Sequence, residues 1–233
     1  MSDPRIAVVA EGPTDIVVIE AALKALLQRP FLLNQLQPEP TRPDMGNGWG
    51  GVFKWCQEFR QRGAVSIEAD PTLSQFDLVI VHLDADVADK NYADCGNAVL
   101  QASLGLARLP CAQPCPPPVH TVAALEAVLL SWLGLAATGP KSLFCIPSKA
   151  TEAWLAAAVL PQGHALHDGL ECRLDLESQL AKLSKKERIR KTGREYQSWS
   201  QTIAIQWAQV TARCSQATAF EQQIHNAARN FPV

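Results

Sequence analysis

Three carboxylate side chains directly follow apolar runs of the kind that form buried strands. Glu11 comes after the run at residues 5–10, and Asp84 and Asp86 come after the run at residues 76–83. In a parallel α/β sheet, residues just past the carboxyl ends of strands line the functional crevice, so we expect these acids to converge on one edge. Side chains two residues apart on an extended segment point the same way, which would let Asp84 and Asp86 share one cation.

Clustered carboxylates repel one another unless a hard cation neutralises them. Oxygen ligands alone favour Mg²⁺ or Mn²⁺, which bind through few carboxylates and keep several waters. Such an ion holds a phosphate oxygen and lowers the pKa of a bound water, so the acids predict phosphodiester chemistry. A single Asp at a strand end is commonly only a turn former or a helix cap. It is the pairing of two acidic segments that favours a site.

His82, two residues before Asp84, either faces this site or fills the sheet interface, and the second is the default.

Apolar runs alternate with helical patterns up to about residue 160, which predicts an α/β sandwich with a mainly parallel sheet. Strands are expected at 5–10, 76–83 and 142–146, and helices at 16–28, 52–62, 91–106, 122–135 and 151–159. Beyond Pro161 the strand signal disappears, and helical patterns cover 174–183, 196–214 and 219–228. We therefore divide the chain into a catalytic domain, residues 1–160, and a helical extension, residues 161–233.

Composition sets limits on the function. The 233 residues are 47% hydrophobic and carry a net charge of −2, which excludes histone-like binding of nucleic acid through bulk charge. No apolar run approaches the roughly 20 residues that span a bilayer, so we expect a soluble protein without a membrane partner. The seven cysteines have no repeating spacing and no signal peptide is recognisable, which predicts reduced thiols in the cytoplasm.

One dense basic segment lies between residues 182 and 194. A charge run is usually a solvated helix face. Beside a phosphodiester-type site, it is an equally good candidate for contact with nucleic acid. The candidate residues are Lys185, Lys186, Arg188, Arg190, Lys191 and Arg194.

The string Glu11-Gly12-Pro13-Thr14-Asp15, together with Asp84-Ala85-Asp86, resembles the TOPRIM domain of topoisomerases, DnaG-type primases and OLD-family nucleases. In that family a Glu, usually followed by Gly, comes after the first strand, and a DxD comes after a later strand. The resemblance covers roughly residues 5–160 and is closest to the OLD-like and small stand-alone bacterial branches. It implies a TOPRIM-like Rossmannoid sandwich for residues 1–160.

The resemblance also implies roles for the acids. Glu11 would be a general acid/base or a ligand of a second metal, and Asp84 and Asp86 would hold the metal that contacts the scissile phosphate. In OLD nucleases an acid four residues after the first Glu joins the metal site, which adds Asp15.

Residues 148–152 follow the last predicted strand and should reach the same edge. OLD-like enzymes place further acidic and lysine residues near this region. By resemblance, Glu152 would complete a second metal site and Lys149 would stabilise the charge of the phosphorane. The plainer alternative is that Glu152 only favours the first turn of its helix through the helix dipole.

The resemblance therefore predicts a Mg²⁺-dependent nuclease acting on DNA or RNA, serving as the effector of a bacterial antiviral defence system. OLD proteins join their TOPRIM domain to an ATPase and this chain has no ATPase motif, so the analogy implies a separate ATPase partner. Small proteins of this class often form homo-oligomers.

Two alternative functions stay open. Leu83 to Val87 also resembles the strand end of HAD phosphatases, in which Asp84 would be the nucleophile and Asp86 the acid/base. A non-catalytic regulatory TOPRIM module would keep the acids but cut nothing.

Overall fold

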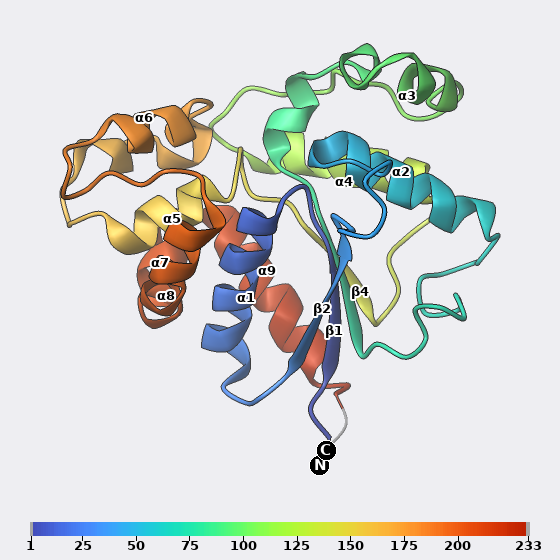
Figure 1. Ribbon diagram of the computed structural model, residues 1–233, viewed down its shortest axis with the longest axis horizontal. Helices are drawn as coiled ribbons and strands as arrows, with labels where there is room; N and C mark the ends of the chain where they lie inside the picture. The colour runs from blue at the N-terminus through green and yellow to red at the C-terminus, as the bar shows by residue number, and fades with distance from the viewer. Residues whose placement is uncertain (1, 232–233) are drawn as a thin grey trace.

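The centre of the molecule is a single sheet of parallel strands. A computed structural model describes residues 2–231. The sheet consists of β1 (Arg5–Val9), β2 (Leu32–Gln37), β3 (Leu78–His82) and β4 (Ser142–Cys145), in the order β2-β1-β3-β4 (Figure 1). The α/β class with a parallel sheet, predicted from the apolar runs, is confirmed.

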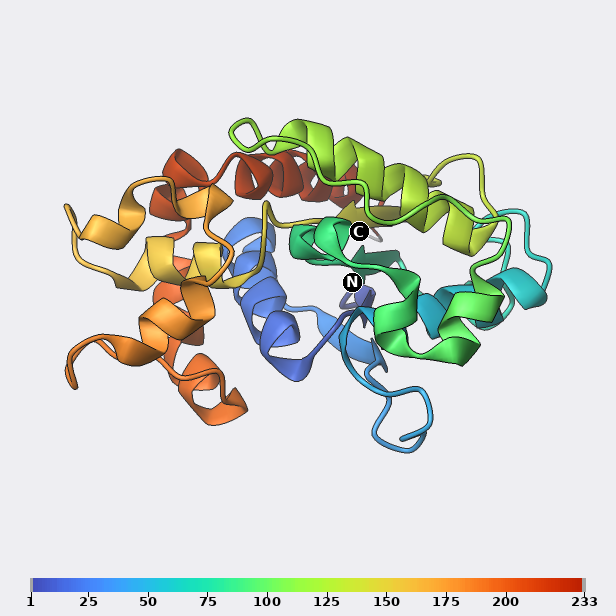
Figure 2. The same ribbon diagram turned by 90° about the horizontal axis from the view of Figure 1, so that it is seen from above.

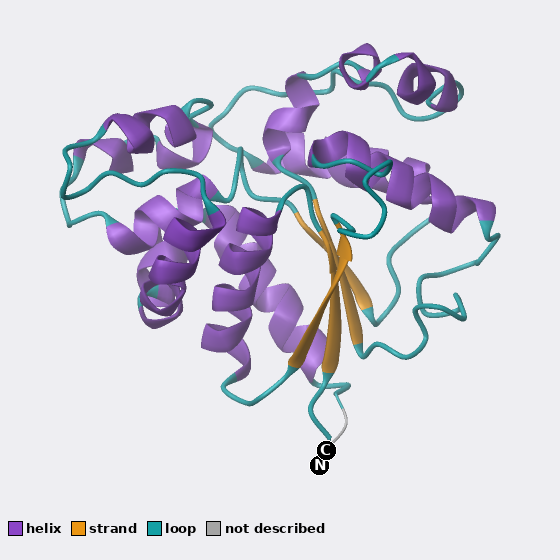
Figure 3. Ribbon diagram, in the orientation of Figure 1, coloured by secondary structure: helices purple, strands orange, loops and turns teal. Residues whose placement is uncertain are grey.

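Helices surround the sheet (Figure 3). Those that follow the first three strands are α1 (Pro13–Leu27), α2 (Gly48–Gln61), α3 (Asn97–Ala102) and α4 (Val119–Leu133), with short 3₁₀ helices η1 (Ala85–Asp89) and η2 (Tyr92–Cys95). After β4 come α5 (Glu152–Val159), η3 (Ala165–His167), η4 (Leu170–Cys172), α6 (Leu176–Lys182), α7 (Gly193–Ile205), α8 (Trp207–Arg213) and α9 (Ser215–Ala228).

Two hydrophobic cores lie on the two faces of the sheet. Successive strand residues point to opposite faces, so Ile6 and Ile80 pack with α1, α5 and α7–α9, whereas Val9 and Val81 pack with α2, α4 and η1. The view from above shows α1 and α2 on opposite sides of the sheet (Figure 2). All four of these strand side chains are fully buried, so the sheet is an apolar layer between two layers of helices.

The strand order reverses between β1 and β3. The chain leaves β1 for β2 on one side, while β3 and β4 lie on the other side of β1. In open α/β sheets, ligands bind outside the carboxyl ends of the strands at such a switch point. In this chain the residues at that point are those that follow Val9 and His82.

The sequence misses one strand, and two predicted helices are wrong. The edge strand β2 was not predicted, because its sequence LLNQLQ is half polar and mostly half-buried or exposed. The helix expected at 91–106 is interrupted at Gly96, whose φ of 91° is outside the helical range, so η2 and α3 form instead. The helix expected at 196–214 is divided at Gln206 into α7 and α8.

The C-terminal helices complete the core on one face of the sheet. Tyr196 and Ile203 of α7 and Phe220 of α9 are buried in the same hydrophobic cluster as Ile19 of α1 and Trp154 of α5. Residues 161–231 are thus helical in their regular parts, as predicted, and pack directly on the α/β part. The division of the chain at residue 160 stays a prediction.

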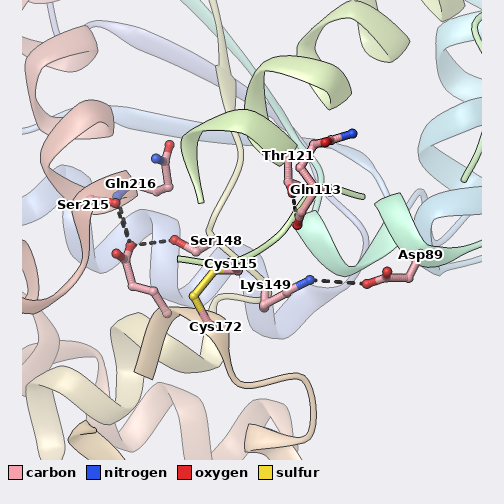
Figure 4. The surroundings of a disulfide bond; sticks show 10 residues. Asp89, Gln113, Cys115, Thr121, Ser148, Lys149, Cys172, Ser215 and Gln216 are labelled. Carbon is pink, nitrogen blue, oxygen red and sulfur yellow. Dashed lines mark hydrogen bonds and ion pairs between the residues drawn. A yellow bond between two sulfur atoms is a disulfide. The ribbon is translucent and has the colours of Figure 1, made fainter. Parts of the chain in front are cut away.

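One pair of cysteines contradicts the expectation of reduced thiols. Cys115, in the Pro-rich loop before α4, forms a disulfide with Cys172 at the end of η4 (Figure 4). Their Cα atoms lie 5.6 Å apart across a sequence separation of 57 residues, a spacing that only the folded chain reveals. Cys56, Cys95, Cys111, Cys145 and Cys214 are free. None of the helices in the described residues is long and apolar enough to cross a bilayer.

Candidate metal centre

Glu11 and Asp84 meet where β1 and β3 end. The backbone N–H of Asp84 donates a hydrogen bond to Oε1 of Glu11 at 2.7 Å. The backbone N–H of Gly48, at the start of α2, donates to the Glu11 carbonyl at 2.8 Å. The structure therefore brings together two acids that are 73 residues apart in sequence, at the switch point of the sheet.

Asp15 joins them from the first turn of α1. Its Oδ1 accepts a hydrogen bond from the Thr151 hydroxyl at 2.6 Å, and the Thr151 backbone N–H donates to Oδ1 of Asp84 at 3.2 Å. Thr151 immediately precedes α5 and is fully buried, as is nearly all of Asp15 and Asp84. A single residue at the start of α5 thus holds acids from two other elements in place.

His82 is the residue of this site that the ligand argument from sequence missed. It ends β3, is fully buried, and places Nε2 at 3.1 Å from Oδ1 of Asp84. One ligand atom each of Asp15, His82 and Asp84 lie within 4.8 Å of one another. Nε2 thus faces the Asp84 carboxylate, whereas Nδ1 of His82 has no hydrogen-bond partner among residues 2–231.

These three residues fit a metal ion. Two buried carboxylates and an imidazole are a donor set that divalent metals accept, and a buried ring nitrogen without a partner, such as Nδ1 of His82, otherwise costs free energy. The sequence predicts oxygen ligands only. The Asp15–His82–Asp84 group adds a nitrogen ligand, which first-row transition metals such as Mn²⁺ accept more readily than Mg²⁺ does.

The electrostatics of the cluster favour a cation. Burial raises the pKa of Asp84 to about 7, and the charge of Asp15 adds to the shift. Burial, followed by the charge of Asp84, raises the pKa of Glu11 well above its usual value. Burial lowers the pKa of His82, but the charges of Asp84, Asp15 and Glu11 outweigh it and raise the pKa to about 9. The charged forms of Glu11 and Asp84 are therefore disfavoured in this site unless a cation neutralises them, which a bound metal would do.

Asp86 follows Asp84 on a turn of the backbone. After Asp84 the chain enters the 3₁₀ helix η1, so the extended segment expected from the sequence is wrong, although both residues line one cavity. The Asp86 side chain is 35% exposed, with Oδ2 at 3.7 Å from Nζ of Lys90. Asp86 is not part of the Asp15–His82–Asp84 group.

Glu152 lies in a separate buried arrangement at the start of α5. Its side chain is 1% exposed, and Oε1 accepts a hydrogen bond from the Tyr196 hydroxyl at 2.6 Å. Nζ of Lys191 lies 3.0 Å from the same oxygen and 3.4 Å from Oε2 of Glu177. Oε2 of Glu152 has no hydrogen-bond partner in the described structure. Glu152 therefore makes specific contacts with Tyr196 and Lys191 in addition to placing a negative charge at the start of α5.

Lys191 and the other basic residues are placed differently. Lys191 turns inward to the acids, whereas the other five candidates are exposed: Lys185, Lys186, Arg188, Arg190 and Arg194. Lys149 pairs with Asp89, and its Nζ lies 3.3 Å from Oδ2 of that residue (Figure 4).

A small cavity of about 80 Å³ adjoins the metal-ligand group. Asp84, Asp86 and Glu152 line it together with the cations Arg173 and Lys191. Acids and cations that face one cavity suit a bound metal next to an anionic group of a substrate.

No family model, curated protein or solved structure matches the chain.

Proposed function

We propose that this chain is a TOPRIM-like phosphodiesterase that uses Mg²⁺ or Mn²⁺ to hydrolyse the backbone of DNA or RNA. The observation that supports it best is the hydrogen bond from the Asp84 amide to Glu11. It joins the acid that follows β1 to the acid that follows β3, at the end of the sheet where ligands of such folds bind.

Each group has a role in the proposal. Asp15, His82 and Asp84 would hold the metal, whose chemistry is to polarise a phosphate oxygen and lower the pKa of a bound water. Glu11 is anchored through Oε1, which leaves Oε2 to exchange a proton with water or substrate. Arg173 and Lys191, which line the adjacent cavity, would face phosphate oxygens.

The remaining residues predicted from the sequence have weaker support for a role in this function. The five exposed basic residues between 185 and 194 would contact the nucleic-acid backbone outside the cavity. Asp86 and Glu152 line that cavity and would serve a second metal. Lys149 is engaged with Asp89 and would need to change rotamer to reach a substrate. A role in antiviral defence, with a separate ATPase, rests on the resemblance to OLD-family nucleases alone.

A phosphatase that uses Asp84 as nucleophile has less support. The Asp84 side chain is buried, and its Oδ1 is occupied by the Thr151 amide and the His82 contact. A complete strand, turn and helix carrying Glu11 also precedes it.

The test combines cleavage with metal binding. Wild type, Glu11→Gln and Asp84→Asn are incubated with single- and double-stranded DNA, plasmid and tRNA in Mg²⁺ or Mn²⁺. We expect cleavage by wild type and a loss of at least about 100-fold in both variants, the scale of removing one electrostatic stabiliser. Glu20→Gln is the matched control, because Glu20 is a half-buried carboxylate that pairs with Lys24, away from the candidate site.

Mn²⁺ titration of the same proteins separates the outcomes. Cleavage at equal rates by all four proteins would remove the catalytic assignment. Mn²⁺ binding that depends on Asp84, without cleavage of any substrate, would favour the regulatory module instead.

A further inference from the structure

Two adjoining cavities form a groove along the free edge of β4. One, of about 500 Å³, lies toward the amino end of the strand and the other, of about 180 Å³, toward its carboxyl end. Both are lined by Glu126 of α4, Phe144 of β4 and Gln223 of α9, so they are continuous. We name this the β4 groove. The view from above shows α4 and α9 side by side along this edge (Figure 2).

The floor of the β4 groove offers unpaired backbone groups. The N–H of Val79 donates to the Lys141 carbonyl at 2.8 Å, and the N–H of Leu83 donates to the Cys145 carbonyl at 3.1 Å. In a parallel pair, alternate residues direct both backbone groups to the same neighbour. Lys141, Leu143 and Cys145 therefore face β3, and Phe144 directs its N–H and C=O outward, where an edge strand accepts another extended chain.

The α9 wall of the groove suits a polypeptide backbone. Gln223 and Asn226 line it from one face of α9, and Asn230 lines it from the turn that follows the helix. None of these three amides makes a side-chain hydrogen bond within residues 2–231. A primary amide both donates and accepts hydrogen bonds, as a peptide backbone does.

The α4 wall supplies one charge. Glu126 is the single charged residue that lines the two cavities, and no described residue gives it a hydrogen bond or an ion pair. Its carboxylate is half-buried, and burial raises its pKa. An unpaired acid in a groove disfavours a polyanion such as nucleic acid and favours a cation.

We propose that the β4 groove binds an extended peptide segment of a partner protein, with a Lys or Arg side chain placed against Glu126. The segment pairs with the outward backbone groups of Phe144 and contacts the amides of α9. This function is independent of the metal centre, since none of the groove residues belongs to the Asp15–His82–Asp84 group.

The probe is a phage-displayed library of 12-residue peptides with randomised positions, selected on the full chain. Peptides with Lys or Arg should be enriched, and binding of the best synthetic peptide, measured by fluorescence anisotropy, should weaken at least about tenfold for Glu126→Gln. Glu126→Lys should select acidic peptides instead. Glu20→Gln on α1 serves as the control and should leave the affinity unchanged.

Two further measurements locate the peptide. A version of the peptide N-methylated at alternate residues should lose binding, because it lacks the N–H groups needed for edge pairing. Amide hydrogen exchange should slow at residues 142–146 when the peptide binds. No enrichment, equal affinity of wild type and Glu126→Lys, or protection elsewhere would overturn the proposal. Concentration-dependent dimerisation that protects residues 142–146 would assign the groove to a second copy of the chain and also overturn it.

Discussion

At the residue scale, Thr151 has a larger part in the metal centre than any pattern indicates. Its hydroxyl and its backbone amide hold Asp15 and Asp84 from two different elements. Groups that orient metal ligands in this way set the position and basicity of the ligands. The geometry of the centre therefore depends on where α5 begins as much as on the acids themselves.

Tyr196 provides a test of the second acidic arrangement. We expect Tyr196→Phe to lower the free energy of unfolding by about 1–3 kcal/mol, because it leaves the buried Oε1 of Glu152 without its hydroxyl donor. Urea unfolding measures the loss. The control is Tyr92→Phe, which also removes a buried hydroxyl, one that bonds Ala107 and Trp132 away from the acids. Of the two variants, only Tyr196→Phe should also change the affinity for Mn²⁺. If that affinity is unchanged, Glu152 takes no part in metal binding.

The sequence allows prediction of some site residues and not of others. Glu11 and Asp84 follow strongly apolar runs, so their position at strand ends is readable. His82 is not, because the choice between facing the site and filling the sheet depends on neighbours that only the fold supplies. The direction of Asp86 depends on the backbone of η1, which turns where an extended segment is predicted.

At the element scale, Asp70 stabilises the loop between α2 and β3. Its carboxylate is fully buried, pairs with the Arg62 guanidinium and accepts hydrogen bonds from the amide and hydroxyl of Thr72, at 2.8 and 2.6 Å. Burial raises the pKa of Asp70, but the bonds from Thr72 and Arg62 together outweigh it and the pKa is lowered. The loop is thus fixed by a charged group.

This lowered pKa predicts a pH dependence. Since the folded-state pKa of Asp70 lies below its unfolded value of about 3.9, its contribution is fully present above that value and is lost as the pH falls through the folded pKa. We expect Asp70→Asn to lower the free energy of unfolding by about 1–3 kcal/mol at pH 7, with a smaller difference near pH 3. Urea unfolding across this range checks it, with Asp3→Asn as the control. A difference that is constant with pH would contradict the assignment.

Strands and helices differ in how far the sequence predicts them. β1, β3 and β4 are buried on both faces and read as continuous apolar runs, so they were predicted within two residues. β2 is half polar and only its last residue is buried, with Leu32 and Gln35 exposed, so it lacks that signal. The periodicity of apolar residues likewise does not reveal a helix boundary that depends on one backbone angle, as at Gly96.

At the scale of the whole molecule, the Cys115–Cys172 disulfide joins the loop before α4 to the segment after α5. Glu171, beside Cys172, also accepts hydrogen bonds from Ser148, Ser215 and the Gln216 amide (Figure 4). The disulfide therefore ties the segment after α5 to the part of the chain before β4, and Glu171 ties the same segment to Ser148 and to the start of α9.

Reduction should weaken this tie. For a loop of 57 residues, the chain-entropy model gives a contribution of about 4 kcal/mol to the free energy of unfolding. We expect Cys115→Ser/Cys172→Ser to unfold at lower temperature than wild type and to be insensitive to reductant. Cys111→Ser, which changes a free cysteine in the same loop, should behave as wild type. Equal unfolding temperatures of wild type with and without reductant would contradict the disulfide.

The central place of β1 has a consequence for biosynthesis. The strand closest to the N-terminus is flanked by β2 and β3, and the helices that cover one of its faces extend to residue 228. The apolar side chains of the first strand therefore gain all their neighbours only once the chain has been synthesised as far as α9. Folding governed by contacts far apart in sequence is slow and leaves apolar surface open to aggregation in the meantime.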